Sequence, residues 1–377
     1  MSTYQYYEFQ AIDRPLTPEE QRAVARLSSR VEPHPRRAIF TYSFGGDLHR
    51  RAEDVLVDYY DAMLYLASWG SRQLVFRLPT ALVDTEKMCQ YNIVTRQYPP
   101  DAIGISTQGE HVILNIRLDE EEGLGWIEGE GWLDSLVGLR DAILQQDYRL
   151  LYLAWLKGLA LAGDVDMEMQ EPPVPAGLQT LSPALESFIE LFGLDEDLIH
   201  VAAESSRVLD EGISDGDLRL AIAQLPAEER DVFLWRLARG EPHLSLALNR
   251  RLGVLGGKSQ GAASERRSVG ALFAAVEALR ERRRKERAAV AEATRVAELK
   301  ALAGHEEETW RQVDVLIQRS QAKAYEEAVW LLTKLQGLAE YQSRQSAFEE
   351  RLDQICDQHS RRRALMRLLR EAGLIDP

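Results

Sequence analysis

Three prolines within four residues, Pro172, Pro173 and Pro175, constrain this chain more than any other feature of its sequence. Proline fixes its own φ and donates no backbone hydrogen bond, so neither a helix nor an interior strand can run through this segment. Together with Glu171, the prolines therefore predict a linker, and residues 1–170 are expected to form a separable domain. A second linker is predicted at Gly253–Ala263, which is rich in Gly and Ser.

The residues before the prolines alternate between strand and helix patterns. Tyr4–Ile12 is a β-prone run, and Thr17 with Glu20 forms a capping box ahead of a predicted helix. Asp47 is expected to cap a second helix that reaches Ser68. Strands are further predicted at 38–44 and 72–78, then a short helix at 82–91 and a hairpin of 103–107 with 111–118.

Beyond Asp119 only helical patterns remain, including predicted helices at 132–146, 148–162 and 227–238, and a long helix over 264–303. The predicted fold class is therefore α+β, with a mixed α/β N-terminal domain followed by an all-α C-terminal array of helical hairpins with one long helix. The expected domains are an acidic domain at 1–170, a small helical region at 176–252, and the long helix with its hairpins at 264–377.

The last predicted helices share one apolar face. Apolar residues recur along them at spacings of three, four and seven, which is typical of the buried face of successive helices. The residues expected to pack are Trp330, Leu331, Leu335, Leu338, Phe348, Leu352 and Ile355.

Charge is distributed unevenly along the 377 residues, whose formal net charge is −15. Residues 101–200 hold 20 Asp and Glu against 4 Lys and Arg, whereas residues 261–377 hold 19 against 21. The acidic part would repel phosphate backbones and attract basic partners. No apolar run reaches the ~18 residues that a membrane-spanning helix needs, and no export signal is visible, so a cytoplasmic protein is expected.

The motifs predict no catalytic residue, no cofactor and no metal site. Cys89 and Cys356 are too few for a disulfide framework or a four-ligand zinc site, and the histidines are scattered. Gly253–Ser259 is similar to a phosphate-binding loop, but it lacks one residue of the required spacing and follows a helix end rather than a strand. The carboxylates of Asp164–Glu168 are interpreted as an acidic tether, since no further oxygen ligand is evident nearby.

The segment Asp119–Glu130 surrounds a tryptophan with carboxylates. Aromatic side chains concentrate binding energy and charge steers the encounter, so this segment suits docking onto a basic, apolar surface. A solvated loop whose tryptophans fold back onto the core is the alternative. The candidate partner-binding residues are Trp126, Glu120, Glu121, Glu122, Glu128 and Trp132.

Arginines concentrate in two helical stretches of the C-terminal third. The run Arg280–Arg287 interrupts the apolar stripe of the predicted long helix, so it is expected to face water on all sides. A second group lies on one helix face at i, i+4 and i+7. Contact with phosphate or with an acidic partner is one interpretation, and a solvated helix surface is the other. The candidate residues are Arg282, Arg283, Arg284, Lys285, Arg363, Arg367 and Arg370.

Three segments, Tyr4–Thr17, Asp58–Gly70 and Leu151–Leu156, together resemble a family of uncharacterised bacterial proteins, and the resemblance spans most of residues 1–250. The tail, Lys323–Leu338 followed by Arg361–Leu374, resembles the helical C-terminal tail of bacterial SWIM zinc-finger proteins. Their zinc motif, Cys-x-Cys followed by Cys-x-His, is absent here. The first resemblance implies no activity. The second implies an assembly surface, and it suggests a SWIM-type zinc-finger protein as a partner.

These observations favour a non-enzymatic interaction or scaffold subunit of a bacterial multiprotein complex. Its expected partners are other proteins, including basic ones, and self-association is compatible with the pattern of charges. Nucleic acid is a less favoured partner, and no membrane contact is expected. Two alternatives stay open: a nucleic-acid-associated subunit that contacts phosphate through the Arg-rich C-terminal helices, and an enzyme whose site is not visible in the sequence.

Overall fold

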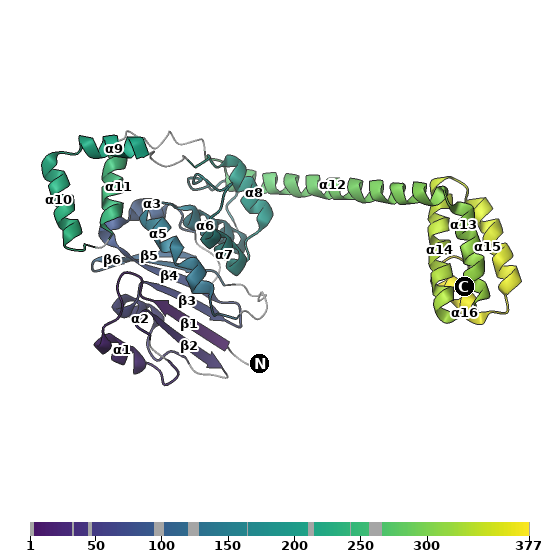
Figure 1. The fold of residues 1–377 in the computed structure, drawn as a ribbon, viewed down its shortest axis with the longest axis horizontal. Helices are drawn as coiled ribbons and strands as arrows, with labels where there is room; N and C mark the ends of the chain where they lie inside the picture. The colour runs from purple at the N-terminus through teal and green to yellow at the C-terminus, as the bar shows by residue number, and fades with distance from the viewer. Residues whose placement is uncertain are drawn as a thin grey trace. The chain divides into compact units, whose positions relative to one another are not determined.

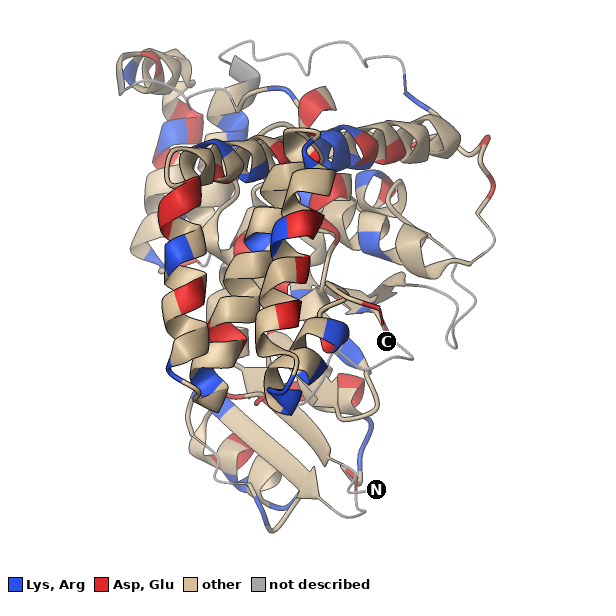
Figure 2. Ribbon diagram, turned by 90° about the vertical axis from the view of Figure 1, so that its right-hand side faces the viewer, with Lys and Arg blue, Asp and Glu red and all other residues tan. Residues whose placement is uncertain are grey.

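The computed structural model describes residues 4–31, 34–43, 47–93, 102–119, 128–163, 165–209, 215–241, 243–255 and 266–376. The chain divides into two compact units, residues 1–279 and residues 280–377, which we call unit 1 and unit 2 (Figure 1). The sequence of unit 1 holds 26 Lys and Arg against 43 Asp and Glu, whereas unit 2 holds 19 against 17 (Figure 2). The acidic surplus therefore belongs entirely to unit 1.

Unit 1 is built on a six-stranded antiparallel sheet with strand order β2-β1-β3-β4-β6-β5. The central strand β3 sends alternate residues to opposite faces, so that Leu64 and Leu66 enter one core while Met63 and Tyr65 enter another. The predicted hairpin is confirmed as β5 and β6. The strands are β1 (Tyr4–Gln10), β2 (Arg37–Ser43), β3 (Ala62–Ala67), β4 (Arg72–Pro79), β5 (Ile103–Gln108) and β6 (His111–Arg117).

Helices cover both faces of this sheet (Figure 1). On one face lie α1 (Pro18–Ala25), which the predicted Thr17–Glu20 capping box begins, and α2 (Ala52–Tyr59). The other face carries the larger core. Its helices are α4 (Trp132–Leu136), α5 (Gly138–Leu144), α6 (Arg149–Leu161), α7 (Pro183–Phe192) and α8 (Glu196–Ser205), with α3 (Thr85–Cys89) and a 3-10 turn at Thr80–Leu82 nearby in the chain.

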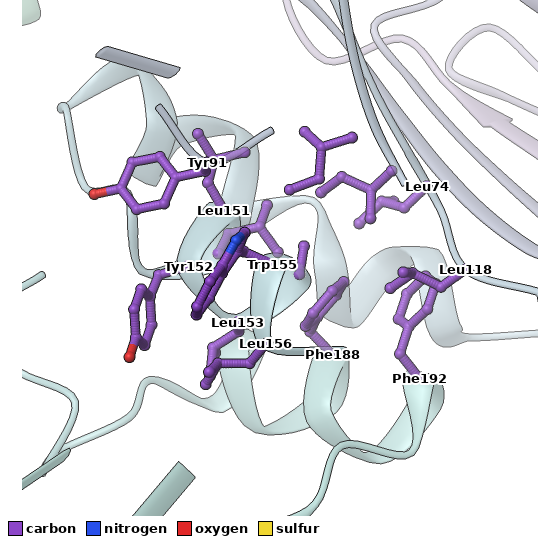
Figure 3. Close-up of a cluster of buried hydrophobic side chains, with 14 of the residues drawn as sticks. Leu74, Tyr91, Leu118, Leu151, Tyr152, Leu153, Trp155, Leu156, Phe188 and Phe192 are labelled. Atoms are coloured by element: carbon purple, nitrogen blue, oxygen red, sulfur yellow. The ribbon is translucent and has the colours of Figure 1, made fainter. Parts of the chain in front are cut away.

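Aromatic rings of α6 and α7 lie at the centre of the larger core (Figure 3). The rings of Tyr152 and Trp155 stack with centroids 5.8 Å apart, and Phe188 and Phe192 meet at 4.5 Å. Because α6 is apolar on nearly every side, eleven of its residues are buried. The long helix α12 (Val269–Ala303) also contributes its first turns to this core, through Val269, Leu272, Val276 and Leu279.

The helix predicted from Asp47 to Ser68 is wrong over its second half. Helix α2 ends at Tyr59, and the chain continues as β3 between β1 and β4. A strand that is buried on both faces shows a continuous apolar run instead of polar–apolar alternation. Residues 62–66 therefore carried no strand period by which the sequence could distinguish them from a helix.

The domain boundaries differ from the prediction because the proline segment is packed rather than free. The Tyr91 hydroxyl donates to the Pro173 carbonyl at 2.9 Å, and the Ser206 hydroxyl donates to the Pro175 carbonyl at 2.7 Å. One continuous core includes residues on both sides of the prolines, from Tyr6 to Leu279. Proline ends regular structure but does not prevent side chains from packing, so the division falls at 279/280 and not at 170 or 176.

A buried carboxylate fastens the same segment to the start of α12. Glu171 is 2% exposed and accepts hydrogen bonds from the Tyr152 hydroxyl and from Arg267, whose Nε lies 2.5 Å from Oε2. The backbone N–H of Glu171 also donates to the carbonyl of Arg267 at 3.0 Å. The N–H groups of Val269 and Gly270, which a helix start leaves without helical partners, donate to the carbonyls of Met169 and Met167.

Unit 2 is a bundle of helices with its own core. The stacking prediction is confirmed for Leu331, Leu335, Leu338, Phe348, Leu352 and Ile355, all of which are buried. It is wrong for Trp330, which is 56% exposed and lies beneath the ammonium group of Lys334. The helices are α13 (Glu306–Gln318), α14 (Ala322–Tyr341), α15 (Gln345–His359) and α16 (Arg363–Glu371), and with unit 1 they confirm the α+β class.

Replacing Glu171 with Ala should destabilise unit 1 by about 3 kcal/mol, because it leaves the half-buried Arg267 guanidinium and the buried Tyr152 hydroxyl without their carboxylate. Urea unfolding of the full chain measures the change. The exposed Glu168 in the same acidic stretch provides the control, since Glu168→Ala should change stability by less than ~0.5 kcal/mol. Equal effects of the two substitutions would contradict a role of Glu171 in holding the unit together.

Within unit 2, Leu335→Ala should cost roughly 2–5 kcal/mol, the usual result of truncating a leucine that is fully packed. Leu335 is 2% exposed, whereas Trp330 on the same helix is 56% exposed, so Trp330→Ala serves as the control with a much smaller cost. Hydrogen exchange of the α14 amides in the full chain measures the change in stability for both variants. A loss below ~0.5 kcal/mol for Leu335→Ala would place this residue on the surface instead.

Candidate functional site

The predicted acidic docking segment lies mostly outside the described residues. This applies to Trp126, Glu120, Glu121 and Glu122, for which docking stays a prediction. Two members of the set are described. Glu128 is exposed, while Trp132 begins α4 and is half-buried against the larger core.

The backbone between these two residues lies tightly against the sheet. A Cβ placed on Gly129 would come 2.3 Å from the ring of Tyr6, so no other residue fits there without displacing that ring. Of the two described members of the set, only Glu128 is exposed.

The predicted basic run on α12 is paired with glutamates of the same helix. Lys285 lies 3.3 Å from Glu281, which also pairs with Arg284, and Arg282 lies 4.0 Å from Glu286. Arg283 is half-buried. Since such surface pairs offset part of the positive charge, this stretch presents less of it than the sequence implies.

The three arginines predicted on α16 do share one exposed face. Arg363, Arg367 and Arg370 are exposed, while Leu365 and Leu369 on the other side of the helix are completely buried. Only Arg367 has an ion pair among the described residues, with Glu371 at 3.6 Å. Acidic and basic bands are interspersed on the helices in Figure 2, whereas the three arginines of α16 share one face with a single acidic partner among the described residues, Glu371.

The structure also reveals an exposed apolar helix that the sequence did not mark as a site. Helix α10 (Ala227–Ala238) was correctly predicted as a helix, yet none of its residues is buried. Four large apolar side chains are more than half exposed, namely Val232 at 52%, Leu234 at 63%, Trp235 at 59% and Leu237 at 63%. We call α10 with these side chains the docking helix. Single exposed apolar side chains are ordinary, whereas several on one helix make that helix a candidate interaction site.

The apolar residues of the docking helix surround it instead of forming one stripe. At 100° per residue, Val232 and Trp235 lie on one side while Leu234 and Leu237 lie on the opposite side. A surface helix of a monomer normally keeps one side polar, and a helix that is apolar all round is normally covered by other elements. This distribution is the sequence signal by which the site could have been found.

The docking helix lies beside α11 (Leu244–Leu255), which packs against α9 (Asp215–Gln224). These two helices pack together through Ala221, Leu225 and Leu252 (Figure 1). The docking helix is tied to α11 by Glu229, whose carboxylate lies 2.6 Å from the guanidinium of Arg251.

Helix α11 is in turn anchored to the sheet domain. Arg250 donates to the carbonyl of Leu144 at 2.6 Å and also to that of Leu82. Just before α11, His243 Nε2 lies 3.1 Å from Asp13 Oδ1. His243 adopts a φ of 58°, a left-handed conformation that costs a non-glycine residue free energy and that the surrounding contacts must maintain.

Asp13, the partner of His243, belongs to a buried network of charged residues. Arg140 is 1% exposed and makes two hydrogen bonds to Asp13, at 2.8 and 2.7 Å, while Arg77 pairs with the buried Asp61 at 2.7 Å. Burial by itself would raise the pKa of Asp13, but Arg140 and then His243 outweigh it, so this pKa lies below its ordinary value. The network has the composition of an acid–base site, but its groups are engaged with one another and serve to fasten β3, β4 and α5.

Other perturbed groups in unit 1 are likewise held by structural partners. Burial, followed by the neighbouring Glu8, raises the pKa of Tyr6, whose hydroxyl donates to Glu8 at 2.8 Å. Burial also raises the pKa of Tyr152 beside Glu171.

A hollow of about 450 Å³ lies along the edge strand β2. It is lined by Arg30, His34, Arg37, Ile39 and Thr41, and Arg37 is already paired with Glu8 at 2.7 Å.

Comparison of the chain with protein-family models, with curated proteins and with solved structures gives no match. Among the described helices, none is both long enough and apolar enough to cross a membrane. Within the same residues, no group of three or more His, Cys, Asp and Glu is placed to hold a metal ion.

Proposed function

We propose that this chain is a non-enzymatic interaction subunit of a bacterial multiprotein complex, and that the docking helix makes its principal protein contact. The observation that carries the proposal is the exposure of four large apolar side chains on a helix with no buried residue. Each apolar Å² that a partner covers contributes about 25 cal/mol, so covering these side chains drives association. Helix α10 is already formed beside α11 in the free chain, which lowers the ordering entropy that binding costs.

The all-round distribution of apolar residues suits a partner with a concave surface. One flat surface would leave either Trp235 or Leu237 in water, so the two sides of the helix are covered either by a groove or by two separate contacts. Unit 1 carries a formal net charge of −17, which favours a groove with a basic rim. A SWIM-type zinc-finger protein remains the partner that the resemblance of the tail suggests.

A second candidate function is contact with nucleic acid through α16. It is favoured by one observation, the exposed face of Arg363, Arg367 and Arg370. The strong acidity of unit 1 opposes binding to phosphate at long range, so this contact would have to come from unit 2.

To test protein docking, the full chain with Trp235→Ala and Leu237→Ala is compared with the wild type in the native assembly recovered from its source cells. The recovered partner subunits should fall at least about tenfold, since exposed tryptophan and leucine become buried on binding. The free chain should keep its stability within ~1 kcal/mol, because both side chains are exposed in it.

A matched control uses exposed residues of the same kinds in unit 2. Trp330 is 56% exposed and Val315 is 50% exposed, so Trp330→Ala with Val315→Ala removes a similar amount of exposed apolar surface. This control should leave the assembly intact. If instead the α10 variant retains its partners as well as the control does, the docking helix is not the contact.

Nucleic-acid binding is tested by reversing Arg363, Arg367 and Arg370 to Glu and titrating the full chain with duplex DNA and single-stranded RNA at several salt concentrations. If α16 contacts phosphate, the slope of log affinity against log salt should decrease by about 3 units for the DNA duplex, one per lost contact. Reversal of the exposed Arg311, Arg319 and Lys323 is the control with the same change of charge. Identical slopes for both triple variants would exclude the α16 face as the contact.

A further inference from the structure

We propose that the side of the docking helix that bears Trp235 pairs with the same helix of a second copy of this chain, in antiparallel orientation. This inference rests on the proposed function, because it names one partner for the same helix. It concerns the residues Glu228, Val232, Trp235 and Arg239, which we call the pairing face.

The spacing of the pairing face is that of an antiparallel coiled-coil seam. Its four residues are separated by four, three and four positions, which places them along one line of the helix. When two such helices run in opposite directions about a two-fold axis, Val232 of one copy faces the partner's Trp235, and Glu228 faces the partner's Arg239. The apolar residues then meet in the middle, with a pair of opposite charges at each end.

Within the described residues of one chain, the charged side chains at the two ends of this seam form no ion pair. Neither Glu228 nor Arg239 has an ion-pair partner among the described residues, whereas Glu229 is bound by Arg251 at 2.6 Å. Arg239 instead places its guanidinium 4.7 Å from the ring centroid of Trp235. It therefore already lies on the pairing face, beside the side chain that the second copy would cover.

The opposite side of the docking helix is less suited to self-pairing. Leu234 and Leu237 have only Arg230 as a charged helix residue on that side, because α10 ends at Ala238 and Gly240, with a φ of 68°, turns the chain before Glu241. Two copies that paired on this side would therefore have no acidic residue of the helix to face Arg230. The local pairs of Glu228 with Arg239 thus select the pairing face for the second copy, against the repulsion between two units that each carry a net charge of −17, and leave the leucine side for a basic partner.

The positions of Glu228 near the start of the helix and of Arg239 near its end also have an explanation that involves only one chain. Acidic residues near a helix start and basic residues near its end stabilise any single helix through its macrodipole. The two explanations differ in one respect, because the macrodipole acts within one copy while the proposed pairs act between copies. Mixing two oppositely altered chains separates them.

The experiment measures self-association of the full chain by sedimentation over a range of concentrations. A pair of 12-residue helices covers less than the ~800 Å² per partner of a standard interface, so a weak, concentration-dependent dimer is expected. Trp235→Ala, Glu228→Arg and Arg239→Glu should each raise the dissociation constant about tenfold or more, the last two by placing like charges opposite each other.

The decisive arm is an equimolar mixture of the Glu228→Arg and Arg239→Glu chains. In the mixed dimer, both ends of the seam carry opposite charges again, so association should return to within about threefold of the wild type. Leu234→Ala with Leu237→Ala changes the other side of the helix and should leave the dimer unchanged. Loss of the dimer in this control, or a mixture no better than its components, would overturn the pairing.

The outcome also separates this inference from the function on which it rests. A wild-type chain that stays monomeric at every concentration, while its α10 variant still loses co-purifying subunits, rejects self-pairing and keeps protein docking. If α10 substitutions alter neither self-association nor the native assembly, both proposals fail.

Discussion

The arrangement of unit 1 depends on one buried carboxylate. Glu171 is joined to Arg267 across 96 residues of sequence, and it lies where the proline segment, α6 and the start of α12 meet. A lone carboxylate in such a place would be strongly unfavourable, but here a guanidinium, a tyrosine hydroxyl and a backbone contact all engage the same residue. Because the neighbouring carbonyls of Met167 and Met169 accept from the first N–H groups of α12, the same junction also determines where the long helix begins.

Much of the fold was predictable from patterns within a few residues. The errors in the predicted fold have a common cause. The capping box at Thr17, the β5–β6 hairpin and the helices of unit 2 follow from patterns within a few residues, and the structure confirms them. Strand β3 and the packed proline segment were missed because distant residues determine both. A strand between two covered faces loses its alternation, and a proline segment reveals nothing in its own sequence about a buried partner 96 residues away.

The candidate site was predictable to a smaller extent. Charge runs are visible in a sequence, so the α16 arginines could be grouped on one face, but the pairs that reduce the charge of the α12 run appear only in the structure. Helix α10, in contrast, is a candidate site that the sequence did not reveal. The sequence predicts a helix over 227–238, but apolar character predicts burial only on average, and the structure is needed to show that α9 and α11 leave this helix uncovered.

The way in which α10 is held explains how unit 1 can keep it exposed. Its neighbours pack apolar residues against each other, and α11 contacts the sheet domain through Leu246 and through the polar anchors Arg250 and His243. The docking helix is therefore positioned by an ion pair at Glu229 rather than by a buried apolar side of its own. The proposed contact with another chain would remove Trp235 and its neighbours from water, and Glu228 and Arg239 at the ends of the pairing face would give that contact a direction.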